Sequence, residues 1–468
     1  MIFNSFQFIL LYPLLFLVYY VFPSGWTRAR NTYLLFLSYL LYMMWGPAYT
    51  LILLAVTAIT FYFALIVSKA KHPKRVLTCG VILALLPLAF FKYFNFVNGI
   101  VGSVLSAIGM NVHLAGLNWA IPIGISFFTF QALGYLWDVY YKRQEVERDF
   151  LTYALFVSFF PSILSGPINK ASLIISQLKK ARPYFDYPKA VVGMRMLLWG
   201  MFAKVVVADR VGLYVDSIFD KYTYYNGMTC FVASLFYTVQ IYADFAGYSL
   251  MALGVGKTLG FDLTENFCRP YFAFSVTDFW RRWHISLSTW LKDYIYIPLG
   301  GSRCSKVRNY WNIFVTFLVS GIWHGANWTF IVWGILHGVA QIVEKMLGQQ
   351  KCNYGRLGKT VKIAITFLLV NFFWIFFRMP SLEDACSFIG IILDFSQPMN
   401  VDFNLTNMAF SVFGMTMLFV KDYTDEFTKV RFFYNRNVII RWTAYVFVLS
   451  SILLAGVFGA DQFIYSNF

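Results

Sequence analysis

The sequence predicts an all-α polytopic membrane protein of about ten to twelve spanning helices, together with re-entrant or interfacial helices. Three observations lead to this prediction. Of the 468 residues, 59% are hydrophobic and only 13% are charged, whereas soluble domains carry about 25% charged residues. Apolar runs recur almost from one end of the chain to the other. One of them, residues 310–343, contains no charged residue and yet includes two histidines.

The apolar runs are expected to be helices, because a transmembrane barrel would show short segments of alternating polarity instead. Several runs approach the roughly 20 residues that a spanning helix needs, and shorter ones are expected to be tilted, broken or re-entrant. The polar stretches between them are too short to bury a core, so residues 1–468 are expected to form one integral membrane domain. The runs cover 4–23, 32–45, 48–68, 76–91, 121–141, 150–165, 190–208, 228–256, 310–343, 360–377, 404–420 and 438–459.

The net charge of +16 comes largely from basic residues that cluster in loops. Cytoplasmic loops of membrane proteins carry an excess of Lys and Arg. The loops at 24–31, 69–75 and 142–149 are therefore expected on the cytoplasmic side, with the N-terminus outside. No compact basic domain exists to bind nucleic acid. Segment 92–120 fits either one long tilted helix or a helix followed by an interfacial piece.

Segment 257–308 interrupts the apolar pattern with closely mixed charged and aromatic residues. Charge interleaved with Trp and Tyr is the composition of a membrane interface. The segment is expected to form short amphipathic or re-entrant helices that line a cavity on the cytoplasmic side.

His324 is the leading candidate for a catalytic residue, because an ionisable group at membrane depth is costly and is usually functional. As one helix, residues 310–343 would be about 51 Å long, much more than a bilayer core requires. A break is expected at Gly321 or Gly325, with Trp323 and Trp328 walling the site. A buried neutral imidazole suits a general base. The alternative is a histidine that hydrogen-bonds to a neighbouring helix.

The other two histidines of this half are harder to interpret. On an unbroken helix His337 would lie nearly opposite His324, and it could share a site with His324 only if the helix breaks. A packing or supporting role is expected for it. His284 lies 40 residues before His324, which leaves a shared site and a purely interfacial position equally open. Arg281 and Arg282 are either interface anchors or cations for a phosphorylated ligand.

Asp244 interrupts the apolar run 228–256, and an acid there is either paired or part of a polar pathway. The two interpretations stay open, and Asp244 is kept as a possible substrate-binding residue. No phosphate-binding loop, zinc-ligand spacing or nucleophile elbow is present, so neither a metal nor a covalent nucleophile is expected.

These motifs resemble the membrane-bound O-acyltransferase family, and within it the bacterial branch of alginate O-acetylation membrane proteins. The resemblance covers nearly the whole chain and is most specific at 242–338. It rests on 279–288 (FWRRWHISLS), 290–301 (WLKDYIYIPLGG) and 321–326 (GIWHGA), supported by 91–95, 122–127 and 242–248.

The resemblance implies a ring of membrane helices around a thinner centre with a tunnel. It places the family's invariant histidine at His324 and its second motif histidine at His284. It further implies a cytoplasmic acyl donor and release of the acyl group on the other face. The Tyr-Ile-Pro-Leu-Gly-Gly ending favours the acetyl-transferring branch over the D-alanylating one, although Lys292 stands where that branch commonly has Arg.

The sequence is therefore interpreted as an O-acetyltransferase of a bacterial inner membrane, with acetyl-CoA as donor and no bound cofactor. His324 would be the base, while Asn327 or His284 would polarise the thioester carbonyl. An envelope polysaccharide or peptidoglycan would be modified, with a separate extracytoplasmic esterase-like partner. Two alternatives remain: D-alanyl transfer from a carrier-protein thioester, and a proton-coupled transporter. The acceptor, the partner and the oligomeric state stay open.

Overall fold

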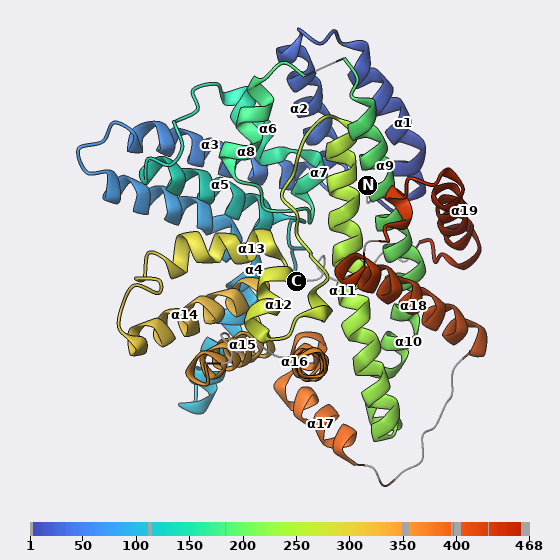
Figure 1. Cartoon of the computed structure of the whole chain (residues 1–468). Coiled ribbons are helices and arrows are strands. Elements are labelled where there is room, and N and C mark those ends of the chain that lie inside the picture. Colours follow the sequence, from blue (N-terminus) through green and yellow to red (C-terminus); the bar gives the residue numbers. More distant parts are fainter. Residues whose placement is uncertain are drawn as a thin grey trace. The chain divides into compact units, whose positions relative to one another are not determined.

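The computed structural model describes residues 3–110, 115–182, 184–348, 355–394, 396, 404–428 and 430–459. Every regular element within these ranges is helical, as predicted (Figure 1). Each apolar run of the sequence coincides with a helix or with a pair of consecutive helices. The helices α12 (Val276–Arg282) and α13 (Ile285–Leu291) lie in segment 257–308, where short helices were expected. Three further helices, α8 (Ala171–Lys179), α10 (Asp209–Phe219) and α17 (Leu382–Leu393), lie outside both the predicted runs and that segment.

The chain forms two compact units. The first comprises 6–190 and 256–264, and the second comprises 3–5, 191–255 and 265–468. A single membrane domain over 1–468 therefore stays a prediction. Besides α8, the helices of the first unit are α1 (Phe6–Val21), α2 (Thr27–Met43), α3 (Pro47–Val67), α4 (Pro73–Ala107), α5 (Ile125–Tyr140), α6 (Phe150–Ser158) and α7 (Phe160–Ile163).

The second unit contains most of two long helices, α9 (Tyr187–Met201) and α11 (Gly227–Thr258), and all the helices that follow. A π-helical turn, Phe202–Ala208, joins α9 to α10 (Asp209–Phe219). Besides α17, the remaining helices are α12 (Val276–Arg282), α13 (Ile285–Leu291), α14 (Lys306–His324), α15 (Trp328–Met346), α16 (Arg356–Arg378), α18 (Leu405–Phe427) and α19 (Val438–Ala455).

Five helical segments of the described residues are long and apolar enough to cross a membrane: 47–67, 73–107, 187–219, 356–378 and 438–455. They support a multi-pass membrane protein. Fewer segments qualify than the ten to twelve spans expected, because several predicted runs form helices that are short or carry polar residues. The helices α6 and α7, for example, divide one apolar run into two short pieces.

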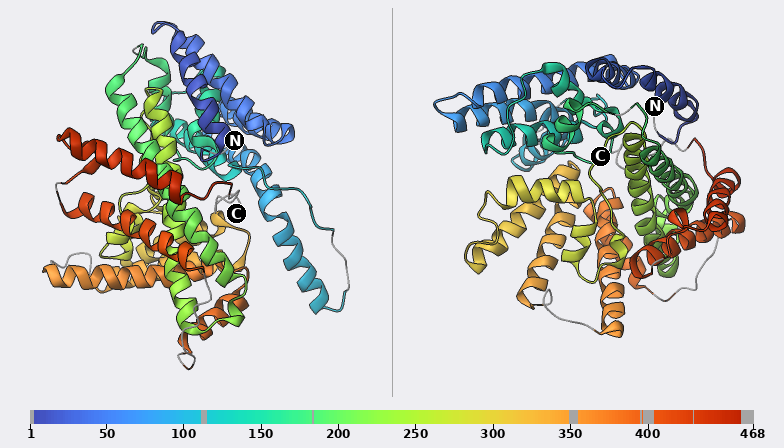
Figure 2. Two further views of the ribbon diagram at one scale, coloured as in Figure 1. Left: turned by 90° about the vertical axis from the view of Figure 1, so that its right-hand side faces the viewer. Right: turned by 45° about the horizontal axis from the view of Figure 1, so that its top comes forward.

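In the first unit, α3, α4 and α5 pack side by side. The helix α4 is one continuous helix of 35 residues, so the long-helix interpretation of segment 92–120 holds as far as Ala107. Its buried residues end at Lys92, and the rest of the helix extends away from its neighbours (Figure 2). Residues 115–124 are largely irregular, and 111–114 lie outside the described ranges.

Two of the basic loops lie at the same end of the first unit. Residues from the start of α2, from the start of α6 and from the end of α8 line one cavity of about 510 Å³. The Lys179 ammonium is 2.7 Å from the Glu147 carboxylate. The two loops 24–31 and 142–149 therefore lie close together, as a shared side of the membrane requires. Their position on one side of the membrane, and the assignment of that side to the cytoplasm, stay predictions.

In the second unit, α14 and α15 form a hairpin, and the predicted break in run 310–343 is confirmed. The helix α14 ends at His324, and α15 begins at Trp328. Asn327 caps α15, since its side-chain oxygen accepts a hydrogen bond from the Thr329 amide at 3.1 Å. The two helices cross closely at Gly321 and Gly334, where a Cβ would lie 2.4 Å from a carbonyl oxygen of the other helix.

Replacing Gly334 with Ala should destabilise the protein by about 1–3 kcal/mol, because the added methyl group would collide with the Phe317 carbonyl oxygen. Thermal unfolding of the purified protein in detergent measures this loss. Gly390→Ala in α17 is the matched control, since a Cβ there meets no atom within 4 Å. Equal melting temperatures for the two variants would contradict the close crossing.

Candidate active site

His284 occupies the joint between α12 and α13 in an unusual backbone conformation. Its φ of 42° and ψ of 54° are left-handed, which costs a residue with a Cβ about 1–3 kcal/mol. The side chain of Ser275 caps α12 by accepting a hydrogen bond from the Asp278 amide at 2.9 Å. The helix ends at Arg282, and the strained turn then directs the next helix away. Strain of this kind is concentrated at functional sites.

Asn266 stabilises this joint. Its side-chain oxygen accepts hydrogen bonds from the Ser286 amide at 3.2 Å and from the Ser286 hydroxyl at 2.8 Å. It lies 3.0 Å from Nδ1 of His284. Because an oxygen that accepts from a backbone amide has no hydrogen to offer, Nδ1 of His284 must be the donor. In the neutral ring Nε2 then carries the lone pair.

The structure brings all three histidines of this half into one buried cluster with two tryptophans. The Trp323 ring lies between His284 and His324, with centroid distances of 6.1 and 4.9 Å. The Trp333 ring lies between His324 and His337, at 4.9 Å from each. Phe377 of α16 packs 5.3 Å from His324. The exposed fraction of His324 is 2%, and that of His284 and His337 is zero.

The helix break explains why His337 joins this cluster. On one continuous helix His337 would lie nearly opposite His324. Because the chain reverses after His324, α15 packs back along α14 and faces it with Trp333 and His337. His284 comes near His324, although forty residues separate them, because α12 packs against α15.

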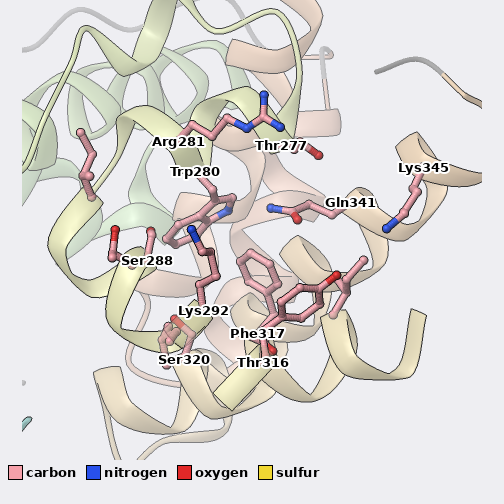
Figure 3. A pocket seen from close by; sticks show the side chains of 15 residues that line it. Thr277, Trp280, Arg281, Ser288, Lys292, Thr316, Phe317, Ser320, Gln341 and Lys345 are labelled. Atoms are coloured by element: carbon pink, nitrogen blue, oxygen red, sulfur yellow. The ribbon is translucent and has the colours of Figure 1, made fainter. Parts of the chain in front are cut away.

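A cavity of about 440 Å³ adjoins the histidine cluster. Figure 3 shows the side chains that line it. It is lined by Thr277, Trp280, Arg281, Ile285, Ser288, Thr289, Leu291, Lys292, Tyr296, Ile313, Thr316, Phe317, Ser320, Gln341 and Lys345. Each histidine has a close neighbour in this wall. Ile285 follows His284, Ser320 lies one turn before His324 on the same helix face, and Trp280 donates a hydrogen bond to His337 at 3.1 Å.

The cavity wall carries three cations but no carboxylate. Arg281 and Lys292 come from the α12–α13 side, and Lys345 comes from α15 (Figure 3). Ser288, Thr289 and Thr316 add hydroxyl groups, and Gln341 adds an amide. An apolar cavity edged by cations and hydroxyls suits a ligand with an anionic, phosphate-like part.

Arg282 does not belong to this wall, whereas Arg281 does. The sequence left both arginines open as interface anchors or as cations for a phosphorylated ligand. The guanidinium of Arg282 is 3.0 Å from Asp278 and 2.8 Å from Glu426 of α18. Arg269 binds the other oxygen of Glu426 at 2.7 Å. The charge of Arg282 is therefore balanced by acids that connect α12 with α18.

Asn327 and Trp328 also differ from expectation. The Asn327 amide group donates to the Pro380 carbonyl oxygen at 2.6 Å, and its oxygen caps α15. The nitrogen and the oxygen of the Asn327 side chain are thus both bonded within the turn between α14 and α15 and to Pro380. In this geometry Asn327 does not polarise a substrate. The exposed fraction of Trp328 is 52%, because the first turn of α15 points it outward. Trp333 and Phe377, and not Trp328, enclose His324 together with Trp323.

Asp244 lies in a buried ionic cluster that the sequence analysis missed. Nζ of Lys204 is 2.6 Å from Asp244 and 2.7 Å from Asp209, and all three side chains are at most 4% exposed. Asp244 is therefore paired, the first of the two interpretations left open. A signal was available, because Lys204 interrupts the apolar run 190–208 as Asp244 interrupts its own run.

Within the described ranges no group of three His, Cys, Asp or Glu side chains could hold a metal ion.

Comparison with known proteins relates the chain to acyltransferases. A model of the membrane-bound O-acyltransferase family matches residues 139–381, which include all three histidines of the cluster. The chain is 37% identical over 400 residues to "Probable alginate O-acetylase AlgI" of Pseudomonas syringae, covering 84% of this chain and 76% of the relative. It is 35% identical over 394 residues to "Peptidoglycan O-acetyltransferase" of Helicobacter pylori, covering 78% and 72%. It is 26% identical over 317 residues to "Teichoic acid D-alanyltransferase" of Bacillus subtilis, covering 64% and 78%.

Replacing Lys204 with Met should destabilise the protein by about 3–5 kcal/mol, because it leaves two buried carboxylates without their cation. The triple variant Lys204→Met/Asp209→Asn/Asp244→Asn removes every charge of the cluster and should recover most of that loss. Thermal unfolding in detergent compares the two. A triple variant as unstable as the single one would contradict a charge-balancing role.

Proposed function

Because the chain belongs to the membrane-bound O-acyltransferase family, we propose that it transfers an acetyl group from cytoplasmic acetyl-CoA across the inner membrane. The acetyl group serves O-acetylation of an envelope polysaccharide or peptidoglycan. The names of the relatives from Pseudomonas syringae and Helicobacter pylori support the acetyl group and these two acceptor classes. The observation that carries the proposal is the buried histidine cluster beside a cavity edged with cations.

The cavity is the proposed entrance for the donor. Arg281, Lys292 and Lys345 attract the phosphate groups of coenzyme A, and the apolar wall accommodates the pantetheine chain. The thioester then approaches Ser320, one helical turn from His324. Acetyl-CoA is a substrate in this proposal, and no resident cofactor takes part.

His324 is the proposed general base. Its imidazole takes the proton from the accepting hydroxyl group as the hydroxyl oxygen attacks the thioester carbonyl carbon. A C–O bond forms, the C–S bond breaks, and the proton held by His324 passes to the departing thiolate of coenzyme A. Burial among Trp323, Trp333 and Phe377 excludes bulk water, which would otherwise hydrolyse the thioester.

His284 has a narrower role than the sequence suggested. With Nδ1 donating to Asn266, the Nε2 atom of the neutral ring accepts a hydrogen bond and has none to offer a carbonyl oxygen. We therefore assign His284 to orienting the acceptor hydroxyl group and not to polarising the thioester. Trp323, between the two imidazoles, keeps their rings apart at a fixed spacing.

The acceptor side is proposed to involve a second protein. Transfer to a large glycan outside the membrane suits a separate extracytoplasmic esterase-like partner, which would complete the O-acetylation. Chemical analysis of envelope O-acetyl groups in a strain that lacks this protein identifies the modified polymer.

Two alternative activities differ in what supports them. D-alanyl transfer from a carrier-protein thioester is supported by the relative from Bacillus subtilis, at the lower identity of 26%. A proton-coupled transporter, the alternative of another class, has less support, because the chain belongs to an acyltransferase family.

Replacing His324 with Ala should lower acetyl transfer by at least about a thousandfold, since the variant has no base on the accepting hydroxyl group. Release of free coenzyme A from labelled acetyl-CoA, by purified protein with an acceptor glycan, measures the rate. His72→Ala, in the exposed turn before α4, is the control and should keep full activity. Normal transfer by the His324 variant would refute its role as the base.

Neutralising Arg281 and Lys292 as Arg281→Gln/Lys292→Gln should raise KM for acetyl-CoA about tenfold or more, because both cations leave the phosphate-binding wall. KM for acetyl-pantetheine, which has no phosphate, should not change. Lys306→Gln, exposed and outside the cavity, is the matched control. Activity confined to a D-alanyl carrier thioester, with no use of acetyl-CoA, would favour the D-alanyl alternative instead.

A further inference from the structure

His337 is fully buried, and the proposed reaction leaves it without a role. Its Nδ1 atom accepts the hydrogen bond from the Trp280 indole at 3.1 Å. An indole N–H can only donate, so the direction of this bond is fixed and the Nδ1 atom of His337 carries a lone pair. Rings of Phe373, Trp333 and Trp280 surround the imidazole at 4.7, 4.9 and 5.1 Å. His337 therefore acts as a neutral acceptor in this arrangement.

A second residue of α15, Glu344, also contacts α12. Glu344 lies seven residues after His337, two turns further along the same face of α15. Its carboxylate accepts hydrogen bonds from the amides of Val276 and Thr277 at 2.5 and 3.0 Å, and from the Thr277 hydroxyl at 2.9 Å. The helix α15 thus holds α12 at two points, one at its first turn and one at Trp280.

The helix α12, which α15 holds in this way, carries residues that the proposed reaction needs. Trp280 and Arg281 form one wall of the cavity. The strained joint at His284 comes directly after α12, which ends at Arg282. A rotation of α12 by a few degrees would move the indole, the cation and the imidazole together. The two contacts with α15 oppose such a rotation.

We propose that His337 is a positioning residue: through its bond to the Trp280 indole it fixes the wall of the cavity, and it takes no proton during the reaction. That acetyl-CoA is the acyl donor in that cavity rests on the proposed function. That His337 holds the Trp280 wall in place does not depend on which donor binds. Loss of the acceptor at His337 frees the indole and widens the cavity, which weakens donor binding and leaves the proton transfer by His324 in place.

Matched variants separate the hydrogen bond from the packing. His337→Phe keeps an aromatic ring but removes the acceptor, whereas His337→Asn can place its Oδ1 atom close to where Nδ1 lies. Trp280→Phe removes the donor from the other side. Steady-state kinetics with acetyl-CoA should show KM raised about fivefold to tenfold for His337→Phe and for Trp280→Phe, with kcat lowered less than threefold.

The double variant His337→Phe/Trp280→Phe should show no further increase in KM, because both changes break the same bond. His337→Asn should recover KM to within about twofold of the original protein. A loss of kcat at unchanged KM, as large for His337→Asn as for His337→Phe, would overturn the proposal and assign His337 a direct role in proton transfer.

A readout that requires no donor keeps this test separate from the proposed function. A cysteine introduced as Ser288→Cys places a thiol in the cavity wall, and mass spectrometry follows its alkylation by a maleimide. The rate should rise at least threefold when His337→Phe is added, and should return to its original value with His337→Asn. An unchanged alkylation rate would refute the positioning role even if acetyl-CoA proved to be the donor. A changed rate in a protein that does not bind acetyl-CoA would instead refute the proposed donor alone.

Discussion

The close crossing of α14 and α15 is the contact on which the site depends. Two glycines, Gly321 and Gly334, let the backbones approach until a methyl group would not fit between them. Helices in membranes often associate through small residues, since lipid offers no hydrophobic force to press them together. Here the crossing, together with the chain reversal after His324, places Trp333 between His324 and His337. Without it, two of the three histidines would face different directions.

The polar contacts of the second unit fall into two groups with different tasks. Asn266, Glu344 and the Trp280–His337 pair fix the short helix α12 and the strained joint at His284. The Lys204 cluster and the Arg282–Glu426 pair balance charges away from the cavity. This division leaves Arg281 and Lys292 exposed on the cavity side. Two cations in one cavity whose lining residues include no carboxylate suit an anionic ligand.

Much of the architecture could be predicted from the sequence because it depends on local composition. Continuous apolar runs predicted the helices. The break was predicted because run 310–343 is too long for one spanning helix and contains Gly321 and Gly325. The basic residues of loops 24–31 and 142–149 indicated that the two loops lie together, and the starts of α2 and α6 do line one cavity. The helix α17 was missed because it begins after Pro380 and mixes acids with apolar residues over only 12 positions.

The site was predicted less completely because it depends on contacts between distant segments. Spacing alone cannot show that α12 packs against α15. Nothing in the sequence therefore placed His337 near His284 or indicated Trp280 as the partner of His337. The contacts of Arg282 and Asn327 could not be foreseen for the same reason: their partners, Glu426 and Pro380, lie far along the chain. Residue type alone does not show whether a polar side chain faces a ligand or another part of the fold.

In the proposed reaction the acyl group reaches the imidazole of His324 from the cation-edged cavity. A cryo-electron microscopy structure with a non-hydrolysable thioether analogue of acetyl-CoA would locate the donor. We expect the phosphates against Arg281 and Lys292, and the acetyl carbonyl carbon within about 4 Å of the His324 ring. An analogue bound elsewhere, with His324 still enclosed by Trp323, Trp333 and Phe377 and out of its reach, would rule out this route.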